Sequence, residues 1–220
     1  TASIPIVFEV GADPVQLGLV SNLNRPGGNV TGVTQTNVEM TPKRLQILHE
    51  LLPTARVMAL LVNPANEATT ETTTREVLAA ARTLGIEVHV LNANVPRDIE
   101  AAFTKAIELR AGGMVVSGGP FFFSQSENLA ARCLQHKLPT IYQFHRFTAA
   151  GGLMSYGSEI TEAYRLAGVY TGRVLKGERP ADLPVQQATK VEFVVNLRTA
   201  KVLGLTVPNT LIGRADEVIE

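Results

Sequence analysis

The sequence has little of what several functional classes depend on. Its 220 residues include one cysteine and no tryptophan, and 20 basic residues balance 20 acidic ones. Because Cys133 stands alone, an intramolecular disulfide is excluded and the redox compartment stays open. The balanced charge, without a basic stripe or a long run of one sign, argues against nucleic-acid binding. No apolar run approaches the roughly 20 residues that a membrane-spanning helix needs.

Patterns typical of catalytic and metal sites are also absent. His49, His89, His136 and His145 are scattered, and no two of them have the spacing of metal ligands. The sequence contains no nucleophile elbow, phosphate-binding loop or dinucleotide fingerprint. Cys133 falls inside a predicted helix without a base close by in the sequence, which favours a small buried hydrophobe. We predict a protein that is not an enzyme and uses no cofactor or metal. A cysteine-dependent racemase or hydrolase is the alternative.

What the chain does contain is a regular alternation of strand-like and helix-like segments. Apolar residues make up 45% and charged residues 18%, which is typical of a compact α/β protein. Several β-branched runs are continuously apolar, as in parallel strands that are covered on both faces. This alternation predicts doubly wound parallel sheets with right-handed crossovers. The predicted strands are residues 4–8, 30–33, 57–62, 86–91, 114–117, 140–142, 153–155 and 193–195.

The ends of several predicted helices are marked by capping residues. Pro follows Asp13 and Thr41, which favours a helix N-cap with Pro at the first helical position. Ser124 and Glu127 have the spacing of a capping box. The predicted helix starts are Asp13, Thr41, Ser124 and Ser158, and the predicted ends are Gly85 and Gly177.

Three motifs in a fixed order carry a family resemblance. Residues 26–32 read PGGNVTG, residues 151–157 read GGLMSYG, and residues 203–208 read LGLTVP. The chain resembles the ABC-transporter substrate-binding proteins of the tryptophan/tyrosine-binding type over nearly its whole length. The resemblance implies a type I periplasmic-binding-protein fold with two hinged lobes. It also implies a small-molecule ligand, captured between the lobes outside the cytoplasmic membrane, and the membrane subunits of an ABC permease as partners.

The resemblance also predicts how the lobes are divided. The first lobe would comprise residues 1–52 and 157–186, and the second residues 53–156 and 187–220. Family members carry further βα units ahead of the strand at residues 4–8, so a truncated first lobe is expected here. Its uncovered strand edge and apolar face predict a homo-oligomer.

The start of the chain bears on location. Residues 1–5 have strand-like character and no signal-peptide features. We expect a periplasmic or membrane-associated extracytoplasmic protein whose signal has been removed, with the cytoplasm as the alternative.

In open parallel sheets, ligands bind at the carboxyl ends of the strands. This rule selects the loop after residues 57–62, where Asn63 and Asn66 offer both hydrogen-bond donors and acceptors to a carboxylate or amide. The N-terminus of the following helix would add free backbone N–H groups. The alternative is that these asparagines only shape a turn.

The same rule, with the resemblance, selects five further residues. Gly119 would let the backbone approach a ligand, and Phe121 belongs to a triplet of phenylalanines that cannot all face one core. Asp13 is a candidate that also suits a helix cap, and Gln143 follows the strand at 140–142. Tyr156 is the aromatic residue expected to line the site.

The function predicted from the sequence is the solute-binding component of an ABC importer. The expected ligand is a small amphiphilic molecule, such as an aromatic amino acid or a related carboxylate. Three alternatives stay open: a small α/β enzyme, a cytoplasmic sensory module, and a non-binding fragment of a longer receptor.

Overall fold

The computed structural model describes residues 3–35 and 37–220, without the side chain of Ala68. Thr1 and Ala2, where the expectation about the start of the chain begins, lie outside the described residues. The chain forms two compact units. Unit 1 comprises Thr1–Asn37 and Ser158–Val191, and unit 2 comprises Val38–Gly157 and Glu192–Glu220. The polypeptide therefore passes from one unit to the other three times.

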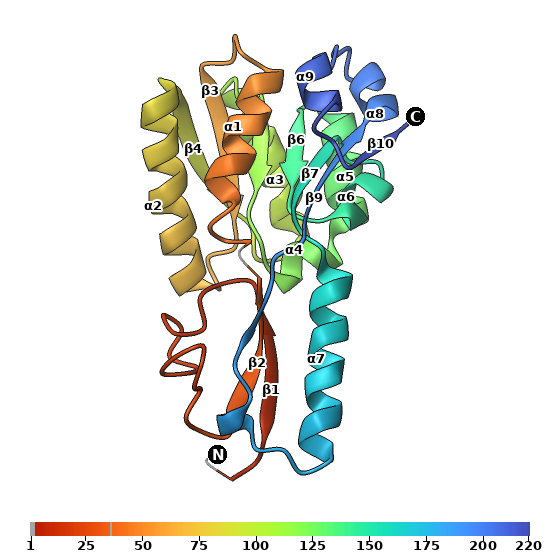
Figure 1. Ribbon diagram of the computed structural model, residues 1–220. Helices are drawn as coiled ribbons and strands as arrows, with labels where there is room; N and C mark the ends of the chain where they lie inside the picture. Colours follow the sequence, from red (N-terminus) through yellow and green to blue (C-terminus); the bar gives the residue numbers. More distant parts are fainter. Residues whose placement is uncertain (1–2, 36) are drawn as a thin grey trace. The chain divides into compact units, whose positions relative to one another are not determined.

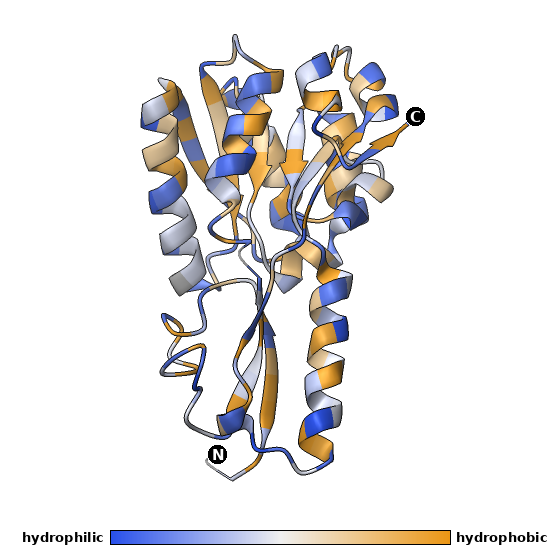
Figure 2. Cartoon of the chain, in the orientation of Figure 1, coloured by the Kyte–Doolittle hydropathy of each residue, from blue (hydrophilic) through white to orange (hydrophobic). Residues whose placement is uncertain are grey.

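Unit 2 is built on a sheet of seven strands in the order β10-β9-β7-β6-β5-β3-β4 (Figure 1). Every strand pair with a recorded register is parallel. β3 is hydrophobic along its length, whereas hydrophobic and hydrophilic residues alternate on β4 and on the helices (Figure 2). The strands are β3 (Val57–Val62), β4 (Glu87–Asn92), β5 (Met114–Val116), β6 (Thr140–Tyr142), β7 (Met154–Ser158), β9 (Val191–Asn196) and β10 (Glu217–Ile219).

Helices cover both faces of this sheet, as the continuously apolar strands require. One face is covered by α1 (Thr41–Leu51), α2 (Glu67–Leu84), α8 (Leu197–Val202) and α9 (Asn209–Ile212). On the opposite face, α3 (Pro96–Glu108), α5 (Ser126–Gln135) and α6 (His145–Ala149) pack on one another (Figure 1). The short helix α4 (Pro120–Ser124) follows β5 and contacts α5.

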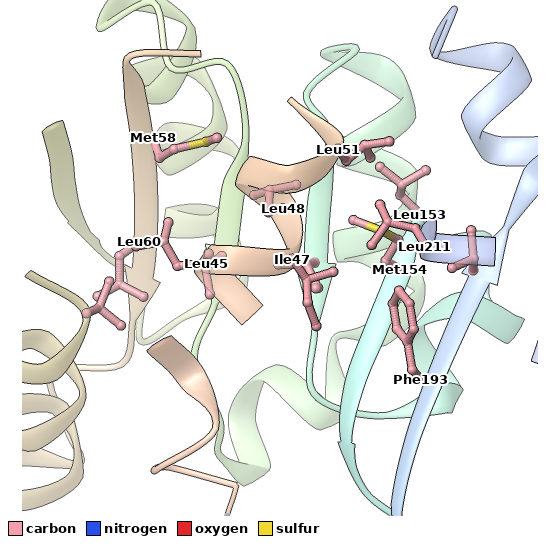
Figure 3. Close-up of a cluster of buried hydrophobic side chains, with 14 of the residues drawn as sticks. Leu45, Ile47, Leu48, Leu51, Met58, Leu60, Leu153, Met154, Phe193 and Leu211 are labelled. Carbon is pink, nitrogen blue, oxygen red and sulfur yellow. The ribbon is translucent and has the colours of Figure 1, made fainter. Parts of the chain in front are cut away.

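The main hydrophobic core lies between the sheet of unit 2 and α1 (Figure 3). Met58 and Leu60 of β3 belong to this core, whereas Ala59 between them does not, as the two-residue period of a strand dictates. Leu45 and Leu48 of α1 are fully buried against it. Because its apolar side is used in this way, α1 belongs to unit 2. The first crossing thus lies at Asn37–Val38, before α1, whereas the family resemblance placed it after residue 52.

Unit 1 contains a parallel sheet with strand order β1-β2-β8. The strands are β1 (Ile6–Val10), β2 (Val30–Gln35) and β8 (Gln186–Ala188). The long helix α7 (Ile160–Leu175) packs on this sheet, with Ala163 against Val33 and Ala188. A 3-10 turn, η1 (Pro180–Asp182), leads into β8.

The glycine-rich motif at residues 26–32 has a physical explanation in this sheet. A Cβ atom on Gly32 would lie 2.1 Å from the carbonyl oxygen of Phe8 and 2.8 Å from its ring. A side chain at this position would force β1 and β2 to shift, so glycine at position 32 lets the two strands pair in this register. Gly27 has φ +81°, a left-handed conformation that glycine adopts without steric cost.

The helix predicted to start at Asp13 does not form. Residues 13–19 make successive turns, in which Asp13 Oδ1 accepts a hydrogen bond from the Val15 N–H at 2.8 Å. Gly18 then takes the left-handed conformation with φ +68°, which interrupts the helical direction. The Asp-Pro pair therefore marks a local turn, which its composition allows equally well.

The other predicted helices exist, but side-chain caps do not start them. Ser124 is the last residue of α4, and the N-cap of α5 is Gln125, so the predicted capping box is wrong. Thr41 is already helical, and Ser158 ends β7 while Glu159 precedes α7. The predicted ends at Gly85 and Gly177 are confirmed, with φ of +67° and +100° respectively.

Candidate functional site

The carboxyl ends of β3, β5 and β6 lie at one edge of the sheet of unit 2, because the strands are parallel. We call the residues that follow these strands the unit 2 rim: Asn63, Asn66, Gly118, Gly119 and Gln143. Four of these five are ligand contacts predicted from the sequence, and Gly118 directly precedes one of them.

The loop after β3 is held by its own hydrogen bonds. Asn63 is buried, and its Oδ1 accepts a hydrogen bond from the Ala65 N–H at 3.0 Å. The carbonyl of Asn63 accepts a hydrogen bond from Thr70 Oγ1 at 2.7 Å. Asn63 thus shapes the turn, which was the alternative to a ligand contact. Asn66 occupies the N-cap position of α2, but its side chain makes no capping hydrogen bond.

The two glycines after β5 bring the neighbouring loops together. A Cβ on Gly118 would lie 2.3 Å from Gln143 Oε1, and one on Gly119 would lie 3.1 Å from Asn66 Nδ2. Gly119 also has φ +134°, which L side chains rarely adopt. The backbone of this loop therefore lies directly against two side-chain amides, one from each flanking loop.

The side chain of Gln143 is buried, and its predicted role as a ligand contact stays a prediction. Its side chain is 5% exposed, and its Oε1 has no hydrogen-bond partner among the described residues. Ser155 Oγ is also buried and has no hydrogen-bond partner among the described residues. Ser155 pairs in register with Tyr142, the residue before Gln143. A buried polar atom without a partner costs about 1–3 kcal/mol. Gln143 directly follows β6, and Ser155 lies on the neighbouring strand β7.

The two aromatic residues predicted to contact a ligand, Phe121 and Tyr156, pack against other aromatic rings. Phe121 is half-buried and packs on the buried ring of Phe122, with ring centroids 5.2 Å apart. The ring of Tyr156 packs edge-on against Phe193 at 6.2 Å and contacts the main core. The structure therefore gives Tyr156 a packing role, and its predicted role as a lining residue stays a prediction.

Arg44 is a buried charge that the sequence reasoning missed. This side chain of α1 is fully buried, and its Nε donates to the carbonyl of Tyr156 at 2.6 Å. Its Nη1 donates to Thr41 Oγ1 at 3.1 Å. Burial lowers the pKa of the Arg44 guanidinium to about 9. The sequence could have revealed this. Arg44 is spaced three and four residues from Thr41 and Leu48, so it lies on the buried side of α1.

A second polar cluster lies at the carboxyl ends of β1 and β2 in unit 1. We call Glu9, Gln35, Asn37 and Ser158 the unit 1 rim. Gln35 Nε2 donates to Glu9 Oε1, Asn37 Nδ2 donates to Gln35 Oε1, and the Ser158 N–H donates to Asn37 Oδ1. Asp13 follows β1, but its carboxylate is used within its own turn. The sequence analysis did not select Gln35 and Asn37. They lie at and after the carboxyl end of β2, where the rule for parallel strands would have selected them.

The environment of Cys133 does not suit a nucleophile. The thiol is buried, and burial raises its pKa to about 11, whereas catalytic cysteines have lowered values. Burial and a raised pKa give this thiol the character of a core residue.

One group of potential metal ligands occurs among the described residues: His145, Glu192 and Glu217, whose donor atoms lie within 4.8 Å of one another. His145 Nε2 lies 3.5 Å from Glu217 Oε1, and both side chains are partly exposed.

Comparison with known proteins identifies the family. Residues 1–219 match the family described as ABC transporter substrate binding protein. The chain belongs to this family. A tyrosine-binding protein of Clostridioides difficile is 24% identical over 205 residues, which make up 93% of this chain. The chain spans only 58% of the length of that protein.

Two solved structures have the same fold. One is a conserved domain protein from Vibrio cholerae, with a TM-score of 0.87, 26% identity, and coverage of 99% of this chain and 72% of its own. The other is an ABC domain from Streptococcus pneumoniae in complex with L-Trp, with a TM-score of 0.86, 26% identity, and coverage of 100% and 73%. Both support the predicted α/β fold of the type I periplasmic-binding-protein kind.

The Clostridioides difficile relative is named a tyrosine-binding protein, and proteins of the matched family typically act outside the cytoplasm. Within residues 3–35 and 37–220, none of the helices has the length and apolar character needed to cross a membrane.

Proposed function

We propose that this protein is the solute-binding component of an ABC importer, with an amino acid or a related amphiphilic carboxylate as its ligand. The observation that carries the proposal is the buried Oε1 of Gln143, which has no partner among the described residues and lies against Gly118. The Trp-bound and tyrosine-binding relatives support an aromatic amino acid as the ligand. Binding between two hinged lobes, and recognition of the closed form by a permease, belong to the same proposal.

The choice of a binding protein over an enzyme rests on chemistry. The unit 2 rim offers amides and backbone groups, which can hold a ligand but supply neither a nucleophile nor a general base. We place the protein outside the cytoplasm, in agreement with its family.

A ligand screen tests the proposal. Isothermal titration calorimetry and thermal-shift measurements with the twenty amino acids and with aromatic carboxylic acids should reveal at least one ligand that raises the melting temperature. Gln143→Leu removes the Oε1 atom while keeping a similar volume, and it should weaken that ligand at least tenfold. The control is Gln46→Leu, an exposed position on α1. A screen without any ligand, or equal affinities for the two variants, would refute the role of this rim.

We also propose that copies of the chain associate through unit 1. β1, an edge strand of the sheet, begins with the exposed Ile6, and Ile4 ahead of the strand is exposed as well. On α7, Tyr164 and Leu175 are exposed by 54% and 82%. Light scattering should show a dimer or larger species at micromolar concentration, and Leu175→Glu should weaken it. A stable wild-type monomer would disprove this association.

A further inference from the structure

The group of potential metal ligands noted above lies entirely within unit 2. It comprises His145 at the start of α6, Glu192 in β9 and Glu217 at the start of β10. Their donor atoms, one imidazole nitrogen and two carboxylate oxygens, lie within 4.8 Å of one another. The three residues come from separate segments of the chain, so the spacing of histidines in the sequence could not reveal them.

The pleat of β9 directs Glu192 toward α6. Phe193 and Val195 of this strand face the main core. Glu192 and Asn196 alternate with them along the strand and therefore face the opposite side of the sheet. That side is covered by α6, because Asn196 Nδ2 donates to the carbonyl of Thr148 in this helix at 3.2 Å.

The second carboxylate, Glu217, is held on the same side of the sheet. It pairs in register with Val194, which also alternates with the core-facing residues of β9. Two hydrogen bonds fix the neighbouring backbone: the Phe193 N–H donates to Asp216 Oδ2 at 2.7 Å, and the Asp216 N–H donates to the carbonyl of Phe193 at 2.8 Å. The backbone next to both glutamates is therefore fixed, and side-chain rotation alone can bring their carboxylates to an ion.

His145 completes the group from the start of α6. Its Nε2 lies 3.5 Å from Glu217 Oε1, which is longer than an ordinary N–H···O hydrogen bond. Two ligands of a tetrahedral Zn²⁺ ion, with bonds of about 2.1 Å, are roughly 3.4 Å apart. The guanidinium of the adjacent Arg146 points elsewhere, since it lies 5.2 Å from the ring centre of Phe123 and its Nε donates to Ser126 Oγ at 3.0 Å.

The donor set suits a divalent transition metal. Two carboxylates supply the two negative charges that balance the ion, and a neutral imidazole supplies a nitrogen ligand. Zn²⁺ accepts nitrogen and oxygen ligands together, whereas Ca²⁺ and Mg²⁺ take oxygen. His145 and Glu192 are half-buried and Glu217 is exposed, so the side chains can adjust and a water molecule can take the fourth position.

We infer that His145, Glu192 and Glu217 bind a Zn²⁺ ion that links α6 to β9 and β10. All three ligands belong to unit 2, and the inference does not depend on the proposed function. The ion fastens β10, an edge strand of three residues that pairs with β9. A ligand of the folded state stabilises that state in proportion to its affinity and concentration, so Zn²⁺ should raise the melting temperature.

Calorimetry with Zn²⁺, after removal of metals with a chelator, tests the inference. The wild-type protein should bind one Zn²⁺ with a dissociation constant of about 10 µM or less, and bound Zn²⁺ should slow hydrogen exchange in β10. His145→Gln and Glu217→Gln should each weaken binding by about tenfold or more, because one of three protein ligands is lost. The matched control is His89→Gln on β4, which removes a histidine that lies 3.2 Å from Glu87 but belongs to no group of three ligands among the described residues.

A second measurement identifies the residue that holds the ion. In NMR spectra of the wild-type protein, Zn²⁺ should shift the imidazole signals of His145 and leave those of His89 unchanged. The melting temperatures of the variants without metal should equal that of the wild type, because the replaced side chains are partly exposed.

The site is overturned if the wild-type protein binds Zn²⁺ more weakly than stated. It is also overturned if both variants retain the wild-type affinity, or if His89→Gln weakens binding as much as they do, since Zn²⁺ then binds elsewhere on the surface. Should a variant melt at a lower temperature without metal, unchanged His145 signals in the wild-type spectra would still overturn the site. Equally tight binding of Ca²⁺ would overturn the assignment to Zn²⁺.

Discussion

Replacing Gly32 by alanine tests whether the glycine-rich motif exists to let two strands approach. The added Cβ would lie 2.1 Å from the carbonyl oxygen of Phe8, which is backbone and cannot rotate away. Inserting one carbon into a well-packed site costs about 1–3 kcal/mol. A clash with a backbone atom should cost at least as much as the upper value of this range. We therefore expect Gly32→Ala to destabilise the pairing of β1 and β2 by about 3 kcal/mol or more.

Hydrogen exchange read by mass spectrometry is the suitable assay, because it resolves β1 from the strands of unit 2. Since about 1.4 kcal/mol corresponds to a factor of ten, the amides of β1 should exchange roughly 100-fold faster or more in Gly32→Ala. The amides of β3 should be unaffected, because they belong to unit 2.

The same motif supplies two controls for this experiment. A Cβ on Gly28 would meet nothing within 4 Å, so Gly28→Ala should change the stability by no more than about 0.5 kcal/mol. Gly27→Ala should cost about 1–2 kcal/mol, because φ is +81° at that position. If the amides of β1 exchanged at the same rate in the Gly32→Ala and Gly28→Ala variants, the explanation by close approach of the two strands would be refuted.

Three further predictions concern buried polar groups. Because burial raises the pKa of Glu9 in the folded state, its ionisation destabilises the fold as the pH rises above the ordinary carboxyl value of 4.5. In urea unfolding, Glu9→Gln should therefore be more stable than the wild type at pH 7.5, with the difference vanishing below pH 4.5; an equal difference at both pH values would contradict this. Arg44→Ala should lose about 3 kcal/mol or more, because the carbonyl of Tyr156 loses a charged donor and a cavity opens; a loss below about 1 kcal/mol in the same assay would show that Arg44 is dispensable. Cys133 should resist alkylation by iodoacetamide in the native protein and react on unfolding, since it is buried and its thiol pKa is about 11; rapid native labelling would disprove its burial.

The strands could be predicted from the sequence where an apolar run decides the structure by itself. Residues 57–62 and 140–142 are strands with the predicted bounds, because continuous β-branched and apolar sequence leaves few alternatives. β8 and β10 were missed, because Gln186–Ala188 and Glu217–Ile219 are three residues long and become strands only by pairing with β2 and β9.

The division into units was harder to predict than the elements themselves. The apolar side of α1 shows that this helix covers a sheet, but nothing in Leu45 or Leu48 says which sheet. Only the folded chain shows that the sheet of unit 2 is the one covered.

The strand-end rule selected the unit 2 rim correctly as a set of neighbouring loops, because parallel topology alone brings strand ends together. It could not predict that Gly118 lies against Gln143, since that contact depends on side-chain orientation.

The three passages of the polypeptide between the units place the segments of unit 1 far apart in the chain. β2 and α7 are separated in the chain by all of residues 38–157, so their contact closes a very long loop in an unfolded polypeptide. Once unit 2 has folded, that stretch is compact and its two ends are fixed. Unit 1 then needs to bring together only short segments. During synthesis β1 and β2 leave the ribosome long before α7 and β8 exist, and the last segment of unit 2, Glu192–Glu220, follows only after them.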